Sequence, residues 1–173
     1  KGVDIHVYQE VWVLLKHQLG LIFENGSTGL VLVVIILFLF LSGRVGLWVT
    51  IGIPVSFMFA TLIFYSVFDG GINIIALIAF VMALGIVVDD AIVVGEDATT
   101  LFEQGYSPAE AAAGGAKRMF LPVMTSSLTT MAAFVPLLLT GGEMGAFIIT
   151  LPTVLLCVIV ASLIECFLIL PGH

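Results

Sequence analysis

Charged residues are scarce in this sequence, and basic ones are the scarcest. Only 10% of the 173 residues are Asp, Glu, Lys or Arg, and Lys and Arg together number five. Proteins that bind nucleic acid use clustered basic side chains to neutralise phosphates, and a chain with a net charge of -7 offers no such cluster. The acidic residues are scattered and form no tail. We therefore expect no nucleic-acid partner.

Cysteine is also rare, and an initiator Met is missing. Cys157 and Cys166 lie nine positions apart in one apolar run, a spacing that fits neither a disulfide framework nor a set of metal ligands. We expect two buried, reduced thiols, no metal site and no cofactor. No signal peptide opens the sequence, and Lys1 is not an initiator Met, so we expect the numbering to begin inside a longer polypeptide.

Apolar residues make up 61% of the chain and gather in long charge-free runs. Each run is close to the ~20 residues that a helix needs to cross the hydrocarbon of a bilayer. A soluble all-α protein would show a polar stripe every three to four residues, which these runs lack. The sequence predicts an all-α membrane protein in contact with the lipid bilayer. Its five spans are expected at about residues 26–43, 45–68, 71–97, 119–140 and 144–170.

Residues 1–24 differ from the spans in pattern. Apolar and polar residues alternate from Val3 to Tyr8, which is typical of the end of a half-buried strand. From Val11 to Ile22, apolar residues recur at helical spacing with polar ones between them. This pattern predicts a short strand followed by an amphipathic helix that approaches the membrane.

Two polar segments carry helix-start signals. Ser107, Pro108 and Glu110 have the spacing of a capping box with proline at the first helical position. They predict an interfacial helix at about residues 108–118, between the third and fourth spans. Asn73 is expected to cap the helix of the third span in the same way.

The basic residues of the short loops predict the orientation of the spans. Arg44 lies between the first two spans, and Lys117 and Arg118 precede the fourth span, so these turns share one side of the membrane. The positive-inside rule makes that side cytoplasmic. The interfacial helix is then cytoplasmic, and the N-terminal segment lies outside.

The third span contains two adjacent carboxylates, Asp89 and Asp90, near its middle. An ionised Asp at the centre of a membrane helix costs ~2.5 to 3.5 kcal/mol, so a functional role is favoured over filler. Adjacent residues point about 100° apart around a helix. Either both side chains look into a polar interior and share a cationic partner, or one does so while the other borders a water path.

Carboxylates this close titrate as a coupled pair, so reversible protonation is the expected chemistry. A proton that crosses the membrane gains ~2.3 kcal/mol per 100 mV and ~1.4 kcal/mol per pH unit, enough to drive a conformational cycle. No Lys or Arg lies inside any predicted span. A cationic partner for Asp89 and Asp90 must therefore come from outside this chain.

Three further acids lie toward the predicted cytoplasmic side. Glu96 and Asp97 follow Asp89 and Asp90 by seven positions, so each lies on almost the same helix face as one member of the pair. They are candidates for an auxiliary proton path, although solvation of the helix end explains them equally and is the favoured interpretation. Glu165, near the end of the last span, is expected to be hydrated rather than to bind a proton.

An intramembrane aspartyl protease is a rival interpretation, because it too buries two acids. Its catalysis needs carboxylates on opposing segments that share a proton around a water molecule. Asp89 and Asp90 diverge on one helix, and no other predicted span contains a buried Asp. We expect a transporter with no catalytic residue rather than an enzyme.

The segment Leu84 to Glu96, LGIVVDDAIVVGE, closely resembles the fourth transmembrane helix of resistance-nodulation-division (RND) efflux pumps. The resemblance covers essentially the whole chain. It extends to residues 52–56 (GIPVS), 71–73 (GIN), 128–137 (LTTMAAFVPL), 162–165 (SLIE) and 169–173 (ILPGH).

The resemblance implies a fold and a mechanism. The helix bundle of RND pumps has two pseudo-repeated halves of six, and this chain resembles helices two to six of the first half. Residues 1–24 then look like the exit from the periplasmic porter domain, and residues 25–173 like the transmembrane domain. The family implies drug/proton antiport, in which Asp89 and Asp90 relay protons and a Lys of the second half pairs with them.

The presence of both acids also bears on the substrate. Heavy-metal members of the family usually carry Ala after the first aspartate, so this chain looks more like the hydrophobe/amphiphile branch, which exports amphiphilic small molecules. A superfamily member that exports lipid or metal, or assists protein export, is the alternative. One departure is Asp97, where the family more often has Asn.

The resemblance implies partners as well. They are a homotrimer in the bacterial inner membrane, a periplasmic adaptor and an outer-membrane channel.

Overall fold

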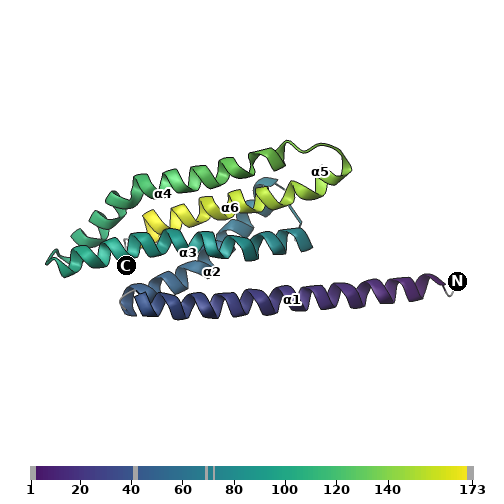
Figure 1. Cartoon of the computed structure of the whole chain (residues 1–173), viewed down its shortest axis with the longest axis horizontal. Helices are drawn as coiled ribbons and strands as arrows, with labels where there is room; N and C mark the ends of the chain where they lie inside the picture. The colour runs from purple at the N-terminus through teal and green to yellow at the C-terminus, as the bar shows by residue number, and fades with distance from the viewer. Residues whose placement is uncertain (1–2, 41–42, 69, 72, 171–173) are drawn as a thin grey trace.

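Every element of the described chain is a helix. The structure is a computed structural model that describes residues 3–40, 43–68, 70–71 and 73–170. Its elements are α1 (Val3–Phe40), α2 (Gly43–Phe68), α3 (Ile74–Glu103), α4 (Pro108–Leu138), α5 (Gly142–Ile148), α6 (Thr150–Ile164) and the π-helix η1 (Glu165–Ile169). Five candidate spans are long and apolar enough to cross a membrane. The predicted all-α membrane fold with five spans is confirmed (Figure 1).

The strand predicted from Val3 to Tyr8 is wrong, because these residues form the start of α1. A strand needs a partner to pair its backbone groups, and the described residues contain no other strand that could supply one. A helix satisfies those groups within itself. The amphipathic helix and the first span therefore merge with the expected strand into one helix of 38 residues, about 57 Å long at 1.5 Å per residue.

α3 is the central helix of the bundle. It packs against α1, α2, α4 and α6, whereas the main contacts of α1 among the described residues are with α2 and α3. Figure 1 shows α1 along one edge, with its N-terminal part extending beyond the other helices. Between Lys16 and Leu39 the side chains of α1 are mostly exposed, so this part of the helix adds little to the core that surrounds α3.

Consecutive long helices run in opposite directions. The ends of α1 and α3 lie at one end of the bundle together with the starts of α2 and α4 (Figure 1). Lys117 and Arg118 in α4 therefore lie toward the end at which α2 begins with Gly43 and Arg44. That this end is cytoplasmic stays a prediction from the positive-inside rule.

The turn between α3 and α4 contains the glycine that its backbone requires. Gly105 has a φ of +96°, in the left-handed region that disfavours other residues, and its N–H donates to the Phe102 carbonyl at 3.0 Å. The N–H of Tyr106 donates to the Leu101 carbonyl at 3.3 Å, which closes the end of α3.

Both predicted helix caps are confirmed. The hydroxyl of Ser107 accepts a hydrogen bond from the Glu110 N–H at 3.4 Å, and the Glu110 carboxylate accepts from the Ser107 N–H at 3.1 Å. Asn73 accepts through Oδ1 from the Ala76 N–H at 2.8 Å and starts α3. These local signals fix where α3 and α4 begin.

Replacing Ser107 with Ala should destabilise the first turn of α4 by about 1 kcal/mol, because it removes the acceptor for the Glu110 N–H. Amide hydrogen exchange in the full-length parent protein should rise over the first turn of α4 and stay unchanged in its middle. Ser107→Thr keeps the hydroxyl and serves as the control. Equal exchange in the Ala and Thr variants would contradict the capping role.

The helix predicted at about residues 108–118 is continuous with the fourth span. α4 runs without a break from Pro108 to Leu138 and contains Pro122 and Pro136. Its first part packs closely on α3: a Cβ added at Gly115 would lie only 2.7 Å from the backbone nitrogen of Ala98. The glycine permits this approach, and the expected boundary near residue 118 is absent.

The last predicted span is divided between three elements. α5 has seven residues, α6 has fifteen, and η1 continues α6 as a π-helical turn. The part that can cross a membrane is Thr150–Ile169, so it begins later than the predicted residue 144. Figure 1 shows α6 alongside α3 and α4. This position brings η1 against α3 at Asp90.

Candidate functional site

One face of α3 is lined by buried side chains, mostly small. They lie three or four positions apart, which places them on one side of the helix. They are Ala76, Ala79, Ala83, Val87, Asp90 and Val94. Asp90 therefore belongs to the face that packs against the rest of the bundle. Small residues on that face let neighbouring helices approach closely.

Asp90 is 7% exposed and contacts two other helical segments. The hydroxyl of Ser127 in α4 donates a long hydrogen bond, of 3.5 Å, to Oδ2 of Asp90. The thiol of Cys166 in η1 donates to the backbone carbonyl of Asp90, also at 3.5 Å. Asp90 thus lies where α3, α4 and η1 meet.

A second face of α3 is open in this chain. Its residues are exposed and again three or four positions apart: Ile78, Met82, Gly85, Asp89, Val93 and Glu96. A Cβ added at Gly85 would meet nothing within 4 Å. Asp89 therefore lies on a mainly apolar stripe with a glycine one turn before it, which would let another helix approach.

The adjacent aspartates consequently look in different directions. Asp90 points into the bundle, whereas Asp89 lies on the open face. Within the described ranges, no Lys or Arg forms an ion pair with either carboxylate. The sequence left open whether both acids would face the interior, and the packing of α3 on α4 and α6 separates them.

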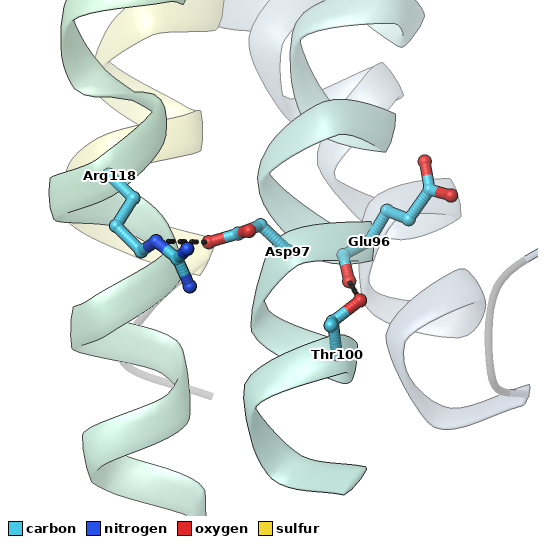
Figure 2. Close-up of polar contacts among 4 residues, drawn as sticks. All are labelled: Glu96, Asp97, Thr100 and Arg118. Carbon is cyan, nitrogen blue, oxygen red and sulfur yellow. Dashed lines mark hydrogen bonds and ion pairs between the residues drawn. The ribbon is translucent and has the colours of Figure 1, made fainter. Parts of the chain in front are cut away.

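Asp97, unlike Asp89 and Asp90, has a basic partner among the described side chains. Arg118 Nε lies 3.8 Å from Asp97 Oδ2, and the Asp97 side chain is 15% exposed. Figure 2 shows Asp97 directed toward Arg118 on α4 and the Glu96 side chain directed away from it. The Thr100 hydroxyl donates to the backbone carbonyl of Glu96 at 3.0 Å, so this contact does not use the Glu96 carboxylate. The two acids do not converge on one site.

The middle of α4 contains five hydroxyl side chains: Thr125, Ser126, Ser127, Thr129 and Thr130. Three of them do back-bond: Thr125, Thr129 and Thr130 donate to the carbonyl four residues earlier. Ser127 differs, since it is buried and bonds to Asp90. Its spacing of four from buried Val123 is the signal that could have placed it on the inner face of α4.

The surroundings of Glu165 also differ from those predicted from the sequence. It is 5% exposed, so the expected hydration is wrong. The π-helical turn and the packing of α2 against it bury the side chain. Among the described residues, no group of three His, Cys, Asp or Glu side chains has an arrangement that could hold a metal ion.

Comparison with protein-family models shows what kind of protein contains this site. Residues 1–172 match the model of the AcrB/AcrD/AcrF family. The chain belongs to this family of RND efflux transporters. The match spans the acids of α3, the Ser127 contact and η1, and the predicted RND resemblance is confirmed.

Individual relatives agree with this assignment. The multidrug resistance protein MdtC of Salmonella arizonae is 35% identical over 145 residues, which is 83% of this chain and 14% of that protein. The MdtC proteins of Salmonella paratyphi B and Salmonella newport are 34% identical over the same shares. The chain thus spans about a seventh of the length of these relatives. Family membership and the five candidate spans make it a multi-pass inner-membrane protein.

Proposed function

We propose that this chain is the proton-coupling part of the membrane domain of a proton-driven multidrug efflux pump. In this proposal the pump is a drug/proton antiporter, and Asp89 and Asp90 relay the protons. The observation that carries the proposal is the placement of two adjacent carboxylates on two faces of one membrane helix. Asp90 is buried against Ser127, and Asp89 lies on an open face.

The two positions support different steps. Asp90 lies among α3, α4 and η1, so a change in its charge acts directly on the contact between these segments. Asp89 can meet a group that approaches the open face beside Gly85. Because the carboxylates are adjacent, a positive charge near Asp89 also lowers the cost of ionising Asp90. Protonation and charge pairing can therefore alternate at this point.

The partner for the open face is proposed to be a Lys from a second transmembrane half. No basic side chain of the described residues pairs with Asp89, and an unpaired carboxylate in hydrocarbon is costly. The relatives are about seven times longer than the matched segment, so such proteins have ample chain to cover this face. A helix that carries one Lys opposite Asp89 would neutralise the Asp89 carboxylate and cover the apolar stripe of α3.

The remaining parts of the proposal concern the whole transporter. Residues 1–24 would form the exit from a periplasmic porter domain, and amphiphilic substrates would bind in the periplasmic domains rather than in this segment. The pump would act as a homotrimer with a periplasmic adaptor and an outer-membrane channel. The name of the relatives, multidrug resistance protein, favours drug cargo over the lipid or metal alternative.

Glu96 and Asp97 stay candidates for an auxiliary proton path in this proposal. The pairing of Asp97 with Arg118 gives Asp97 a structural role at the contact of α3 and α4. Glu96 lies on the same open stripe as Asp89, two turns nearer the end of α3. Of the two, Glu96 is the better placed to exchange protons with Asp89 through water.

The test is proton-driven dye transport by the full-length parent protein in proteoliposomes. With a pH gradient imposed, Asp89→Asn should abolish gradient-driven dye transport, because the amide keeps the size of the side chain but binds no proton. Abundance and orientation in the vesicles must match the unaltered protein. Glu103→Gln, an equal charge change at an exposed position of the same helix, is the control and should transport normally.

Two results would decide against the proposal. One is gradient-driven transport by Asp89→Asn at the normal rate, which would leave the carboxylate as a structural polar group. The other is equal loss in Asp89→Asn and Glu103→Gln, which would show that α3 tolerates no charge change. An effect of Glu96→Gln in the same assay would identify the auxiliary path.

A further inference from the structure

Glu165 is a buried acid of the bundle that takes no part in the proposed proton relay. It begins η1 and is 5% exposed. Among the described residues, its carboxylate has no hydrogen-bond donor and no basic partner. A buried carboxylate that is neither paired nor hydrogen-bonded is costly, and proteins avoid this cost by binding a cation or a proton.

The carboxyl group of Glu165 is inserted against the backbone of α2. A Cβ added at Gly52 would collide with Glu165 Oε1 and would lie 2.6 Å from Glu165 Cδ. Only glycine at this position leaves the space that the carboxyl group fills. The side chain is therefore held in the contact between α2 and η1, where the residue is 5% exposed.

Two serines lie about one helical turn from this contact along their own helices. Ser56 follows Gly52 by four residues on α2, and Ser162 precedes Glu165 by three residues on α6. Residues at these spacings share a helix face. α2 and α6 run in opposite directions (Figure 1) and pack against each other. By these spacings, both serines are therefore on the same side of the contact between Gly52 and Glu165.

The hydroxyls of Ser56 and Ser162 are unpartnered. Both residues are 1% exposed, and neither Oγ has a hydrogen-bond partner within the described ranges. Other hydroxyls of α2 behave differently, since Thr50 and Thr61 each donate to the carbonyl four residues earlier at 2.7 Å. Two buried hydroxyls that do not bond to their own helix are free to bond to a group between α2 and α6.

We propose that Glu165, Ser56 and Ser162 form a second proton-binding site at the interface of α2 and α6. A neutral carboxyl group donates one hydrogen bond and accepts others, and a hydroxyl does both, so that these three side chains can satisfy one another directly or through water. The Gly52 backbone against the carboxyl group leaves little room for a hydrated metal ion, which makes a proton the cation that fits.

The groups that face η1 set the electrostatic surroundings of Glu165. From α3 the nearby titratable group is Asp90, whose backbone carbonyl accepts from the Cys166 thiol of η1. α4 faces η1 with apolar side chains, including Phe120, whose ring centroid lies 5.2 Å from that of Phe167. α2 contributes Gly52, whose backbone lies against the Glu165 carboxyl group, and Arg118 forms an ion pair with Asp97. The site therefore has an acid and a thiol nearby and no base among the described side chains.

This inference concerns a different group from the relay of Asp89 and Asp90, although a role in transport would rest on the proposed function. Infrared difference spectroscopy of the full-length parent protein in lipid, recorded during a pH titration, tests it. The unaltered protein should show a protonated carboxyl C=O band that Glu165→Gln removes and Glu165→Asp retains. The band should disappear reversibly at alkaline pH. It should persist when Asp89 and Asp90 are both replaced by Asn.

The second set of variants tests the environment of the carboxyl group. Ser56→Ala and Ser162→Ala should shift the C=O band to higher wavenumber, because a hydrogen bond to the carboxyl group is lost. Gly52→Ala should alter the band in the same measurement by displacing the carboxyl group. These three variants keep the site testable if Glu165→Gln does not fold.

Three results would overturn the inference. The first is a spectrum that Glu165→Gln leaves unchanged, which would mean that Glu165 is ionised throughout. The second is a Glu165 band that is present at every pH, which would mean a permanently neutral structural group. The third is a band whose titration depends on Na⁺ concentration, which would identify a metal-ion site. None of these results bears on dye transport by the Asp89 and Asp90 variants, so the two proposals fail separately.

Discussion

Asn in place of Asp90 should reduce dye efflux by cells that carry the full-length parent protein to the level of cells without the pump. Asn keeps the shape of the side chain and can still accept the hydrogen bond from Ser127. What it loses is the ability to gain and release a proton at the point where α3, α4 and η1 meet. Because the change is isosteric and Asp90 is buried, the expected effect is on the transport cycle rather than on packing.

Comparison with Ser127→Ala separates protonation from hydrogen bonding. The bond from Ser127 to Asp90 is 3.5 Å long and should contribute no more than about 1 kcal/mol. Ser127→Ala should therefore lower efflux only partly, while Asp90→Asn abolishes it. Glu103→Gln controls for the change of charge. If Asp90→Asn is inserted at normal abundance and still exports dye, Asp90 is a structural polar group and the proposed relay is wrong.

The elements that could be predicted from the sequence are those with local signals. The apolar runs predict the five spans because a bilayer requires ~20 apolar residues for each crossing. Asn73 and Ser107 predict where α3 and α4 begin because each caps an N–H three residues later, within its own turn. Neither prediction needs any knowledge of which helices are neighbours.

The prediction of a strand from Val3 to Tyr8 is wrong because a strand, unlike a capped helix, depends on a neighbouring segment. A six-residue alternation is compatible with a strand only if another strand lies beside it, and sequence pattern alone does not show the neighbour. In the described chain these residues extend the first helix. The boundary expected near residue 118, between the interfacial helix and the fourth span, is absent. This too involves a neighbouring segment, since the fit of Gly115 against Ala98 depends on the position of α3.

Some features of the candidate site could be predicted from the sequence, and others could not. The identity of the two acids and the divergence of their side chains follow from the sequence and the geometry of a helix. Which of them is buried depends on how α3 is rotated against α4 and α6. The alanines Ala76, Ala79 and Ala83 are in phase with Asp90, and they indicate its inward direction once they are recognised as a packing stripe. The burial of Glu165 depends on contacts between distant segments and has no comparable local signal.

Valine in place of Gly115 should strongly destabilise the contact between α3 and α4. A Cβ at this position would lie 2.7 Å from the backbone nitrogen of Ala98 and 2.9 Å from its Cα. Backbone atoms cannot swing aside, so the helices must separate, and overpacking of this kind typically costs about 1 to 3 kcal/mol. The separation would also weaken the ion pair of Arg118 with Asp97, which crosses the same interface.

Alanine substitutions at three glycines separate the gain in helix propensity from the cost of steric overlap. Gly to Ala in a helix gains up to about 1 kcal/mol in propensity, so Gly115→Ala should be only moderately destabilising. At Gly114 the nearest atom is Leu101 Cδ1, the end of a flexible side chain, and Gly114→Ala should be close to neutral. Gly20→Ala, where a Cβ would meet nothing within 4 Å, should be neutral or stabilising.

Thermal unfolding of the purified full-length parent protein, followed by intrinsic fluorescence, would rank these variants. The expected order of stability is Gly20→Ala, Gly114→Ala, Gly115→Ala and then Gly115→Val, from the most to the least stable. Gly115→Val with the stability of Gly114→Ala would mean that α3 and α4 do not meet through their backbones at Ala98. Because this contact holds α4, and with it Ser127, against α3, its loss should also reduce the efflux that depends on Asp90.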